Sequence, residues 1–371
     1  MLRFDCTAGD RLQNRVSEVR AMQAGGNILG QGVFGCTFDP APRCAGGPVF
    51  KKIDGLPAVG KLTSEDTTSE LAIGKAIMAL PMASVYFALP SAGCSPAMPI
   101  ADPDVKDCRV ISESGEGAKF SLLIMPDGGQ QLLKYALNLP RLASNYKRIF
   151  VHLLEGGVIY QNAGYVHNDI HMGNVLVDNA GVARYIDFGL AFKLNDVKVW
   201  EDGNLGVRFK PKFIWQAPEI HAWRMMLNHI PLDEGSRQLK ANNPEYAKME
   251  HQFPTRRPLS FVLADLFRES PFFENRDGGG LVRKYGKRFD CWRLGLCMWM
   301  LWDDMLHWSA FTGTRLYAER ELFRKVLGGM TEFDPEKRMS MAEALRLLDP
   351  NNKLPRAPPL ANLIVPLRGA Q

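Results

Sequence analysis

The spacing of apolar residues predicts strands in the first part of the chain and helices over most of the remainder. Short apolar runs that predict strands occur at residues 58–62, 105–111 and 120–125, and helical spacing occurs at 64–80, 142–163, 220–227 and 259–267. The longest apolar-rich run, residues 294–302, is too short to span a bilayer and predicts a buried helix. Three consecutive glycines at 278–280 predict a flexible joint.

One polar loop between two apolar stretches carries the side chains with the clearest chemistry. The loop holds His167, Asp169 and Asn174, and an Asp-Phe-Gly triplet begins at Asp187 after a second short strand-like piece. Phosphoryl transfer needs one carboxylate that accepts the proton of the attacking hydroxyl, and an amide oxygen and a second carboxylate that hold magnesium. Asp and Asn also favour turns, so either residue alone would predict only a turn. The ordered set predicts phosphoryl transfer.

In these motifs the chain resembles the protein-kinase family. The resemblance implies that Asp169 is the catalytic base, that Asn174 is a metal ligand and that Asp187 is the principal metal ligand. It also implies ATP and Mg²⁺ as cofactors, and transfer of the γ-phosphoryl group to a Ser or Thr hydroxyl of a protein substrate.

A glycine-rich segment precedes these motifs, with Gly30, Gly32 and Gly35 in the spacing Gly-x-Gly-x-x-Gly. Glycines let the backbone approach phosphates, although the same spacing also marks dinucleotide-binding folds. A kinase loop is favoured because no helix opens at Gly35 and the kinase motifs lie downstream. By the resemblance, Lys61 in the following strand contacts the α- and β-phosphates of the nucleotide.

The resemblance further implies a carboxylate partner for Lys61 on the helix that follows it. Glu70 is the first choice because it lies at the edge of the apolar face of that helix, and Glu65 is the alternative because the interval from Lys61 to Glu70 is short for a protein kinase. By the same resemblance, Met125 guards the back of the adenine pocket and Asp127 faces the ribose. An ordinary turn is the alternative role for Asp127.

The kinase resemblance covers residues 27–348 and predicts an α+β, two-lobed protein-kinase-like fold, with a small antiparallel-sheet N-lobe and a mainly helical C-lobe. The expected parts are an N-terminal arm at 1–26 with a helix between residues 11 and 22, an N-lobe at 27–126, a C-lobe at 127–348 and a C-terminal tail at 349–371.

Three further positions match the C-lobe of kinases. Glu219 of an Ala-Pro-Glu triplet would pair with Arg338 and anchor the substrate-binding segment, and Asp290 would cap the backbone of the catalytic loop from a buried helix. The insert at 221–289 is longer than most protein kinases carry between these motifs. We interpret it as a docking or regulatory element for a partner, with padding against the lower lobe as the alternative.

Two catalytic-loop positions depart from the family's pattern. His171 stands where Ser/Thr kinases usually have the Lys that steadies the γ-phosphate, which makes His171 a catalytic candidate, and Asn168 replaces the Arg that usually precedes the base. The string Asp-Ile-His-Met-Gly-Asn is also similar to small-molecule kinases of the aminoglycoside and choline-kinase type. Such a kinase, which would generally lack Ala-Pro-Glu and Arg338, and a nucleotide-binding pseudokinase scaffold are the alternatives.

The segment from Leu190 to Gln216 contains no Ser, Thr or Tyr, so it offers no hydroxyl for an activating phosphate. We therefore expect activity that does not depend on phosphorylation of this segment. Four aromatic side chains are expected to anchor it by burial, namely Trp200, Phe209, Phe213 and Trp215.

The net charge and the cysteine content indicate which ligands and which cellular location the chain fits. A formal charge of +5 fits an anionic ligand such as a nucleotide and does not suggest a nucleic-acid-binding protein. The apolar runs, which are too short to span a bilayer, predict no association with a membrane. The seven cysteines form no Cys-x-x-Cys pair, which predicts reduced thiols in a cytoplasmic protein. The strings Glu-Leu-Ala-Ile-Gly-Lys-Ala-Ile and Gly-Val-Phe-Gly-Cys-Thr-Phe resemble protein kinases encoded by large DNA viruses, which implies the host cytoplasm or a virion.

Overall fold

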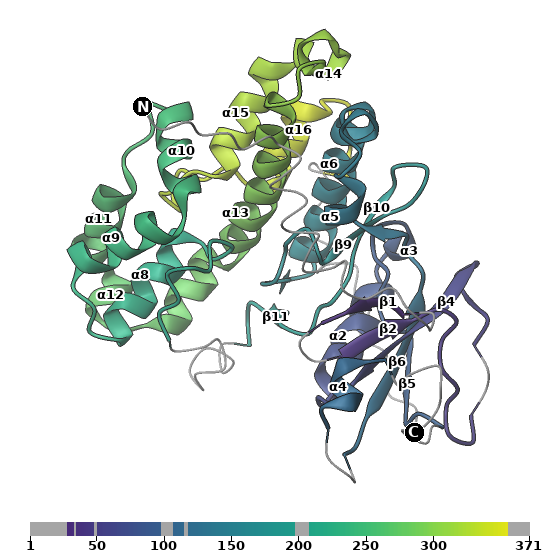
Figure 1. Ribbon diagram of the computed structural model, residues 1–371. Helices are drawn as coiled ribbons and strands as arrows, with labels where there is room; N and C mark the ends of the chain where they lie inside the picture. Colours follow the sequence, from purple (N-terminus) through teal and green to yellow (C-terminus); the bar gives the residue numbers. More distant parts are fainter. Residues whose placement is uncertain are drawn as a thin grey trace. The chain divides into compact units, whose positions relative to one another are not determined.

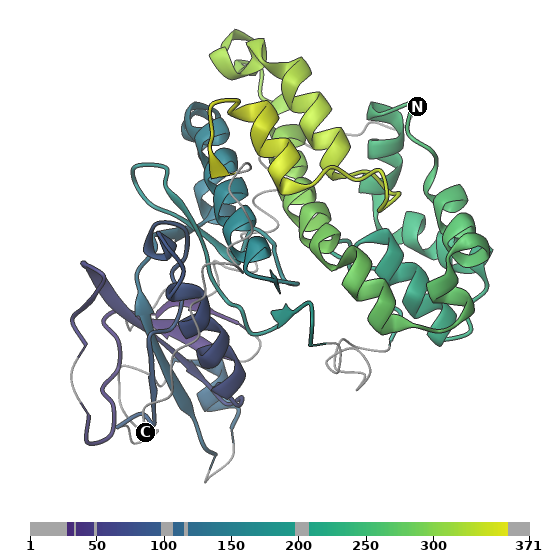
Figure 2. The ribbon, with the colours of Figure 1, turned by 180° about the vertical axis from the view of Figure 1, so that it is seen from behind.

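The computed structural model describes residues 28–32, 35–47, 50–97, 107–114, 118–196 and 208–354 (Figure 1 and Figure 2). These residues separate into two compact units. The first takes the described parts of Met1–Leu142, with Gly173–Leu190 and His307–Ser309, and the second takes those of Ala143–Met172, Ala191–Leu306 and Ala310–Gln371. The first is built on an antiparallel sheet and the second is mainly helical, so the predicted α+β, kinase-like fold is confirmed. The helix expected between residues 11 and 22 lies outside the described residues.

The first unit contains two antiparallel sheets. The strands of the larger sheet are β1 (Ile28–Gln31), β2 (Gly35–Phe38), β3 (Lys52–Ile53), β4 (Leu56–Thr63), β5 (Ala92–Cys94) and β6 (Ser121–Pro126). Their order is β1-β2-β4-β6-β5, and β3 pairs with β4. The smaller sheet has the order β10-β9-β7 and consists of β7 (Gln130–Gln131), β9 (Val175–Val177) and β10 (Ala183–Tyr185). The described part of this unit also contains the helices α2 (Thr68–Met78), α3 (Ala83–Tyr86), α4 (Arg109–Ser112) and α5 (Leu132–Tyr135).

Alternation along β4 gives the larger sheet two different faces. Lys61 pairs with Leu123, and Val59 on the same face pairs with Met125, so the lysine stands beside a small buried apolar cluster. The opposite face carries Leu62 and the larger apolar cluster of this unit. Because successive side chains of a strand point to opposite faces, burial of both clusters fixes the register that places Lys61.

The strand predicted at residues 105–111 is wrong. Its described part contains the short helix α4, and the neighbour of β6 in the sheet is β5 instead. The apolar residues Cys108 and Ile111 are buried within the larger cluster, where they cover a face of the sheet. Apolar residues that cover a sheet need no strand geometry, which explains why a short apolar run misled the prediction.

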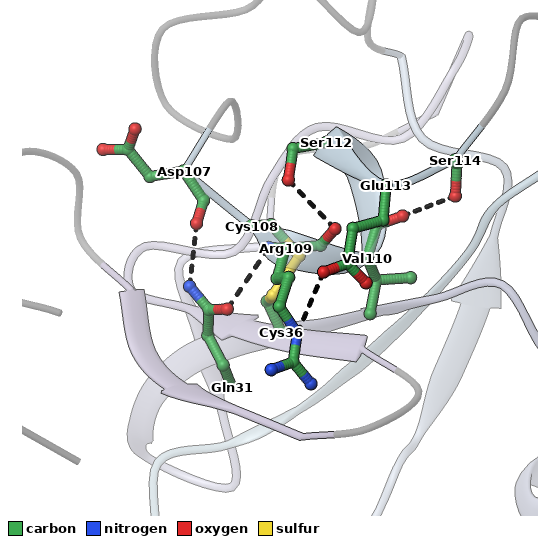
Figure 3. The surroundings of a disulfide bond; sticks show 9 residues. All are labelled: Gln31, Cys36, Asp107, Cys108, Arg109, Val110, Ser112, Glu113 and Ser114. Carbon is green, nitrogen blue, oxygen red and sulfur yellow. Dashed lines mark hydrogen bonds and ion pairs between the residues drawn. A yellow bond between two sulfur atoms is a disulfide. The ribbon is translucent and has the colours of Figure 1, made fainter. Parts of the chain in front are cut away.

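The expectation of reduced thiols is also wrong, because four cysteines form disulfides. One bond joins Cys36 of β2 to Cys108, directly before α4 (Figure 3). Beside it, Gln31 donates to the carbonyl of Asp107 at 2.8 Å and accepts from the backbone N–H of Arg109 at 3.2 Å. The hairpin that carries the glycine-rich turn is therefore tied to α4 by one covalent bond and two hydrogen bonds.

The second disulfide joins Cys44 to Cys94 and lies within the loop closed by the first. The paired cysteines are 72 and 50 residues apart in the sequence, so no local spacing marks either pair. Cys291 and Cys297 are free and buried, and burial raises the pKa of Cys291 to about 11. A raised pKa keeps that thiol protonated and unreactive at neutral pH.

The second unit contains most of α6 and nearly all later elements. Its helices are α6 (Leu139–Asn162), α8 (Pro218–Leu227), α9 (Leu232–Asn242), α10 (Pro244–Gln252), α11 (Leu259–Glu269), α12 (Pro271–Glu274), α13 (Gly278–Leu306), η1 (Phe311–Gly313), α14 (Arg315–Ala318), α15 (Arg320–Met330) and α16 (Met341–Leu348). The strands β8 (Tyr165–Val166) and β11 (Phe192–Lys193) form an antiparallel pair beside the catalytic loop. The helices predicted at 142–163, 220–227 and 259–267 are confirmed.

Helix α13 is the buried centre of the second unit, where α15 packs against it and α8 to α12 lie to one side of it (Figure 1 and Figure 2). The predicted buried helix at 294–302 is its second half. The flexible joint predicted at 278–280 is wrong, because these glycines form the first turn of α13. An added Cβ at Gly278 would lie 2.8 Å from the Trp223 ring, so close packing requires glycine there. Among the described helices, none combines the length and apolarity needed to cross a membrane.

Candidate active site

Lys61, Glu70 and Asp187 meet in the first unit. The ammonium nitrogen of Lys61 lies 3.0 Å from Oε1 of Glu70 and 3.2 Å from Oδ1 of Asp187. Glu70 reaches the lysine from the first turn of α2, which packs Leu71 against the apolar cluster on the Lys61 face of the sheet. Of the two carboxylates considered from the sequence, the structure brings Glu70 to Lys61, whereas the backbone N–H of Glu65 donates to the Thr63 hydroxyl in the preceding turn.

Burial and charge act on this group in opposite directions. Burial acts to lower the pKa of Lys61, but the Asp187 and Glu70 carboxylates outweigh it and raise that pKa overall. Burial raises the pKa of Glu70, and the nearby Lys61 ammonium only partly opposes this effect. Two acidic groups on one cation leave local negative charge that a divalent cation would relieve.

Two of the three glycines leave space beside the backbone. Among the described residues, an added Cβ at Gly30 would meet nothing within 4 Å, and one at Gly32 would make only an ordinary contact of 3.7 Å. At Gly35 the same atom would lie 2.2 Å from the Leu62 carbonyl oxygen, so of these three glycines Gly35 is the one that packing against described residues requires. Open space beside Gly30 and Gly32 fits a ligand that approaches the backbone closely, as a polyphosphate does.

Asn174 and Asp187 are brought together by the smaller sheet. The backbone N–H of Ile186 donates to the carbonyl of Asn174 at 3.1 Å, so the chain reaches Asp187 directly beside that residue. Phe188 is fully buried and packs edge-on against Phe87, which fixes the turn. Asp187 has a φ of 60°, a strained backbone conformation that often occurs at functional sites.

An amide oxygen and a carboxylate are the kind of oxygen ligands that magnesium takes together with phosphate oxygens and water. The described residues contain no group of three or more His, Cys, Asp and Glu side chains that could form a complete metal cage. A magnesium ion held by Asn174 and Asp187 would therefore complete its coordination from the nucleotide, and the donor set fits that arrangement.

Met125 and Asp127 lie at the end of β6. Met125 is buried on the same face of the sheet as Lys61. The Asp127 carboxylate accepts a hydrogen bond of 2.9 Å from the backbone N–H of Gly129, which forms the turn considered as its alternative role. Gly129 has a φ of 106° and lies against the backbone of Val177, so this turn requires glycine. Contact between Asp127 and a ribose remains a prediction.

In the second unit, Asp290 of α13 holds the catalytic loop by its backbone. The Asp290 carboxylate accepts hydrogen bonds from the N–H groups of His167 at 2.7 Å and Asn168 at 2.9 Å, and from the Tyr160 hydroxyl at 3.0 Å. Asp290 is fully buried, and these donors satisfy the charge. Asn168 has a φ of 61°, which Asn tolerates better than most residues, and this explains how the loop turns without a glycine.

Asp169 follows this turn with its side chain 21% exposed, and two basic side chains lie near it. Nε2 of His171 is 3.8 Å from Oδ2 of Asp169, and Nη1 of Arg293 is 3.5 Å from Oδ1. The His171 ring also lies 6.1 Å from the Trp215 ring. Sequence reasoning missed Arg293. The available signal was a single charged residue in the otherwise apolar stretch 291–302, three positions after Asp290.

Glu219 and Arg338 form a fully buried bidentate ion pair. Nη1 and Nη2 of Arg338 lie 2.7 and 2.8 Å from the two carboxylate oxygens of Glu219, and both side chains are 0% exposed. The segment before Glu219 is held by α13, because the Trp292 indole N–H donates to the carbonyl of Ile214 at 3.2 Å. Phe209 packs edge-on against the ring of His221. Trp200, which was expected to anchor this segment, lies outside the described residues.

No protein-family model matches the chain. The chain is similar to eukaryotic protein kinases at low identity. Cyclin-dependent kinase 12 of Caenorhabditis elegans is 25% identical over 207 residues, which cover 53% of this chain and 24% of that protein. The mitogen-activated protein kinase kinase kinase MST11 of Pyricularia oryzae is 24% identical over 200 residues, covering 53% of this chain and 20% of that protein.

A shorter match comes from the serine/threonine-protein kinase cst-1 of Caenorhabditis elegans, which is 28% identical over 106 residues, or 26% of this chain and 20% of that protein. The chain therefore matches less than a quarter of the length of each of these three relatives.

Proposed function

We propose that this chain is an ATP- and magnesium-dependent protein kinase that phosphorylates Ser or Thr hydroxyls. The observation that carries the proposal is the half-buried Lys61 ammonium, held 3.0 Å from Glu70 and 3.2 Å from Asp187. One carboxylate can orient the lysine toward a phosphate while the other remains available to a divalent cation. The similarity to named eukaryotic protein kinases supports the same class of reaction.

The nucleotide-binding tasks fall to residues of the first unit. The open space beside Gly30 and Gly32 would let backbone N–H groups face phosphate oxygens, and Lys61 would add a positive charge. Asn174 and Asp187 would hold magnesium, which neutralises phosphate charge when it is bound.

Proton transfer falls to Asp169 of the second unit. As the acceptor hydroxyl oxygen forms its bond to the γ-phosphorus, the bond from that phosphorus to the β,γ-bridging oxygen would break and ADP would leave, while the hydroxyl proton would pass to a carboxylate oxygen of Asp169. Asp290 keeps the loop in one conformation through the hydrogen bonds to His167 and Asn168. His171, whose Nε2 lies 3.8 Å from Oδ2 of Asp169, would steady the γ-phosphate from the position that other kinases fill with Lys.

A protein acceptor is favoured over a small molecule by the Glu219–Arg338 pair. This pair fixes the start of α8 to the loop before α16, and so holds the segment that ends at Ala217. Small-molecule kinases generally lack this motif, whereas protein kinases use it to anchor the segment that receives a peptide. A docking partner for the helices of the 221–289 insert remains a prediction.

The test is phosphate transfer from γ-labelled ATP, with magnesium, to two sets of acceptors. One set is a mixed protein panel, and the other contains aminoglycosides and choline. The proposal predicts label in protein, recovered as phosphoserine or phosphothreonine after acid hydrolysis. Label only in the small molecules would favour the small-molecule kinase. Nucleotide binding without transfer to either set would favour the pseudokinase scaffold.

A further inference from the structure

Helix α13 contacts the catalytic loop through a second charged residue besides Asp290. Arg293 is 3% exposed and lies three positions after Asp290, so the two side chains leave the helix on neighbouring parts of one face. Nη2 of Arg293 donates to Oδ1 of Asn168 at 3.4 Å, and Nη1 lies 3.5 Å from Oδ1 of Asp169. The Arg293 guanidinium therefore contacts the side chains of Asn168 and Asp169, which belong to the loop whose backbone is held by Asp290.

Burial of a guanidinium is costly unless a carboxylate compensates its charge. Burial lowers the pKa of Arg293, while the carboxylates of Asp169 and then Asp290 oppose that effect. Among the described residues, Nε and Nη1 of Arg293 have no hydrogen-bond partner, so the attraction to these carboxylates is the main compensation for the charge. An arginine held this way restricts where the Asp169 carboxylate can lie.

We propose that Arg293 is a positioning residue for the catalytic base, which it holds through direct contacts to Asn168 and Asp169. This inference rests on the proposed kinase function. Asn168 cannot supply the positive charge of the Arg that usually stands before the base, and the following segment has no hydroxyl to phosphorylate. Arg293 supplies a permanent cation from within the core, so the base is positioned without a phosphorylation step.

Substitution of Arg293 separates positioning from simple stability. Arg293→Met keeps the length of the side chain and removes its charge, so we expect kcat to fall roughly 10- to 100-fold while KM for ATP changes less than about twofold. Arg293→Lys keeps the charge but offers one nitrogen in place of a fork, so we expect a kcat between those of wild type and Arg293→Met.

Arg256→Met is the matched control for the loss of a buried arginine. Arg256 is 8% exposed in the same unit and donates to the carbonyl of Gly328 and the hydroxyl of Thr331. We expect Arg256→Met to lower the melting temperature by at least as much as Arg293→Met, and to leave kcat within about twofold of wild type. The inference would be overturned if Arg293→Met had the same kcat as wild type. It would also be overturned if the kcat of Arg293→Lys were no higher than that of Arg293→Met.

Crystal structures of wild type and Arg293→Met provide a readout that does not require turnover. Displacement or loss of order of the Asp169 carboxylate in the variant supports the inference, and an unmoved carboxylate overturns it. If the wild type transfers no phosphate, the proposed function fails, while these structures still decide whether Arg293 positions Asp169.

Discussion

The Glu219–Arg338 pair predicts a large loss of stability when one partner is removed. Both side chains are 0% exposed, and two nitrogens of Arg338 meet two oxygens of Glu219. Removal of one partner of a buried pair leaves an uncompensated charge and costs about 3–5 kcal/mol. We expect Arg338→Met to lower the free energy of unfolding of the helical unit by about 4–5 kcal/mol, at the upper end because backbone carbonyls also lose a donor.

The double variant tests whether charge is the main cause. Arg338 also donates to the backbone carbonyls of Glu332, Arg288 and Phe333. Glu219→Leu combined with Arg338→Met removes both charges and leaves three carbonyls without this donor, at about 1 kcal/mol each. We therefore expect the double variant to lose about 3 kcal/mol. Since Glu219→Leu alone should cost about 3–5 kcal/mol, this loss is smaller than the sum of the two single losses by at least about 4 kcal/mol.

Urea unfolding followed by tryptophan fluorescence measures these losses, since the Arg338 guanidinium lies 5.4 Å from the ring of Trp292. Arg283→Met is the control, because Arg283 is 51% exposed and lies 3.8 Å from Asp277. That variant should lose at most about 1 kcal/mol, as exposed ion pairs do. A loss below about 1 kcal/mol in Arg338→Met, or single losses that simply add, would refute the reasoning.

Three other predictions concern the first unit and the segment from Leu190 to Gln216. Lys61→Met and Glu70→Ala should each reduce phosphate transfer strongly, and the double variant should lose little more, because the two side chains act as a unit. Glu65→Ala should keep its activity. Full activity in Glu70→Ala together with loss of activity in Glu65→Ala would instead make Glu65 the partner of Lys61. Phosphatase treatment of protein expressed without other kinases should leave turnover unchanged. A large loss of turnover on dephosphorylation, caused by removal of a phosphate that orders the segment after Asp-Phe-Gly, would contradict this prediction. Replacement of Cys36 and Cys108 by Ser should lower the free energy of unfolding of the sheet unit by about 3–4 kcal/mol. Thermal melting with the other disulfide intact measures this loss. An unchanged melting temperature would show that this bond does not constrain the unfolded chain.

Local patterns predicted the elements whose structure depends on neighbours in sequence. The long helix at 142–163 and the buried run at 294–302 have periodic apolar faces, and both form as expected. The kinase resemblance also implied that Lys61 would pair with Glu70 and that Lys61 and Asp187 would both serve the nucleotide and its magnesium. Here the family resemblance supplied the long-range information that apolar spacing lacks. The direct contact of 3.2 Å between Lys61 and Asp187, which are 126 residues apart, was not predicted.

Features that depend on contacts distant in sequence were missed. The Cys36–Cys108 bond joins residues 72 apart, and no spacing rule marks it. The glycines at 278–280 looked like a joint because glycine permits many conformations, whereas close approach of Trp223 to Gly278 is what requires glycine within a helix. Arg293 becomes meaningful only once α13 is seen to contact the catalytic loop.

A comparison of wild type with Asp169→Asn decides whether Asp169 acts as the base in phosphate transfer. Labelled ATP and magnesium are supplied with an accepted protein substrate, and nucleotide binding is measured on the same samples. Asp169→Asn should lose phosphate transfer while it keeps nucleotide affinity, because the base acts on the hydroxyl and not on ATP. Asp187→Asn should, in contrast, also weaken magnesium-dependent binding of the nucleotide. Near-normal transfer by Asp169→Asn would contradict the account.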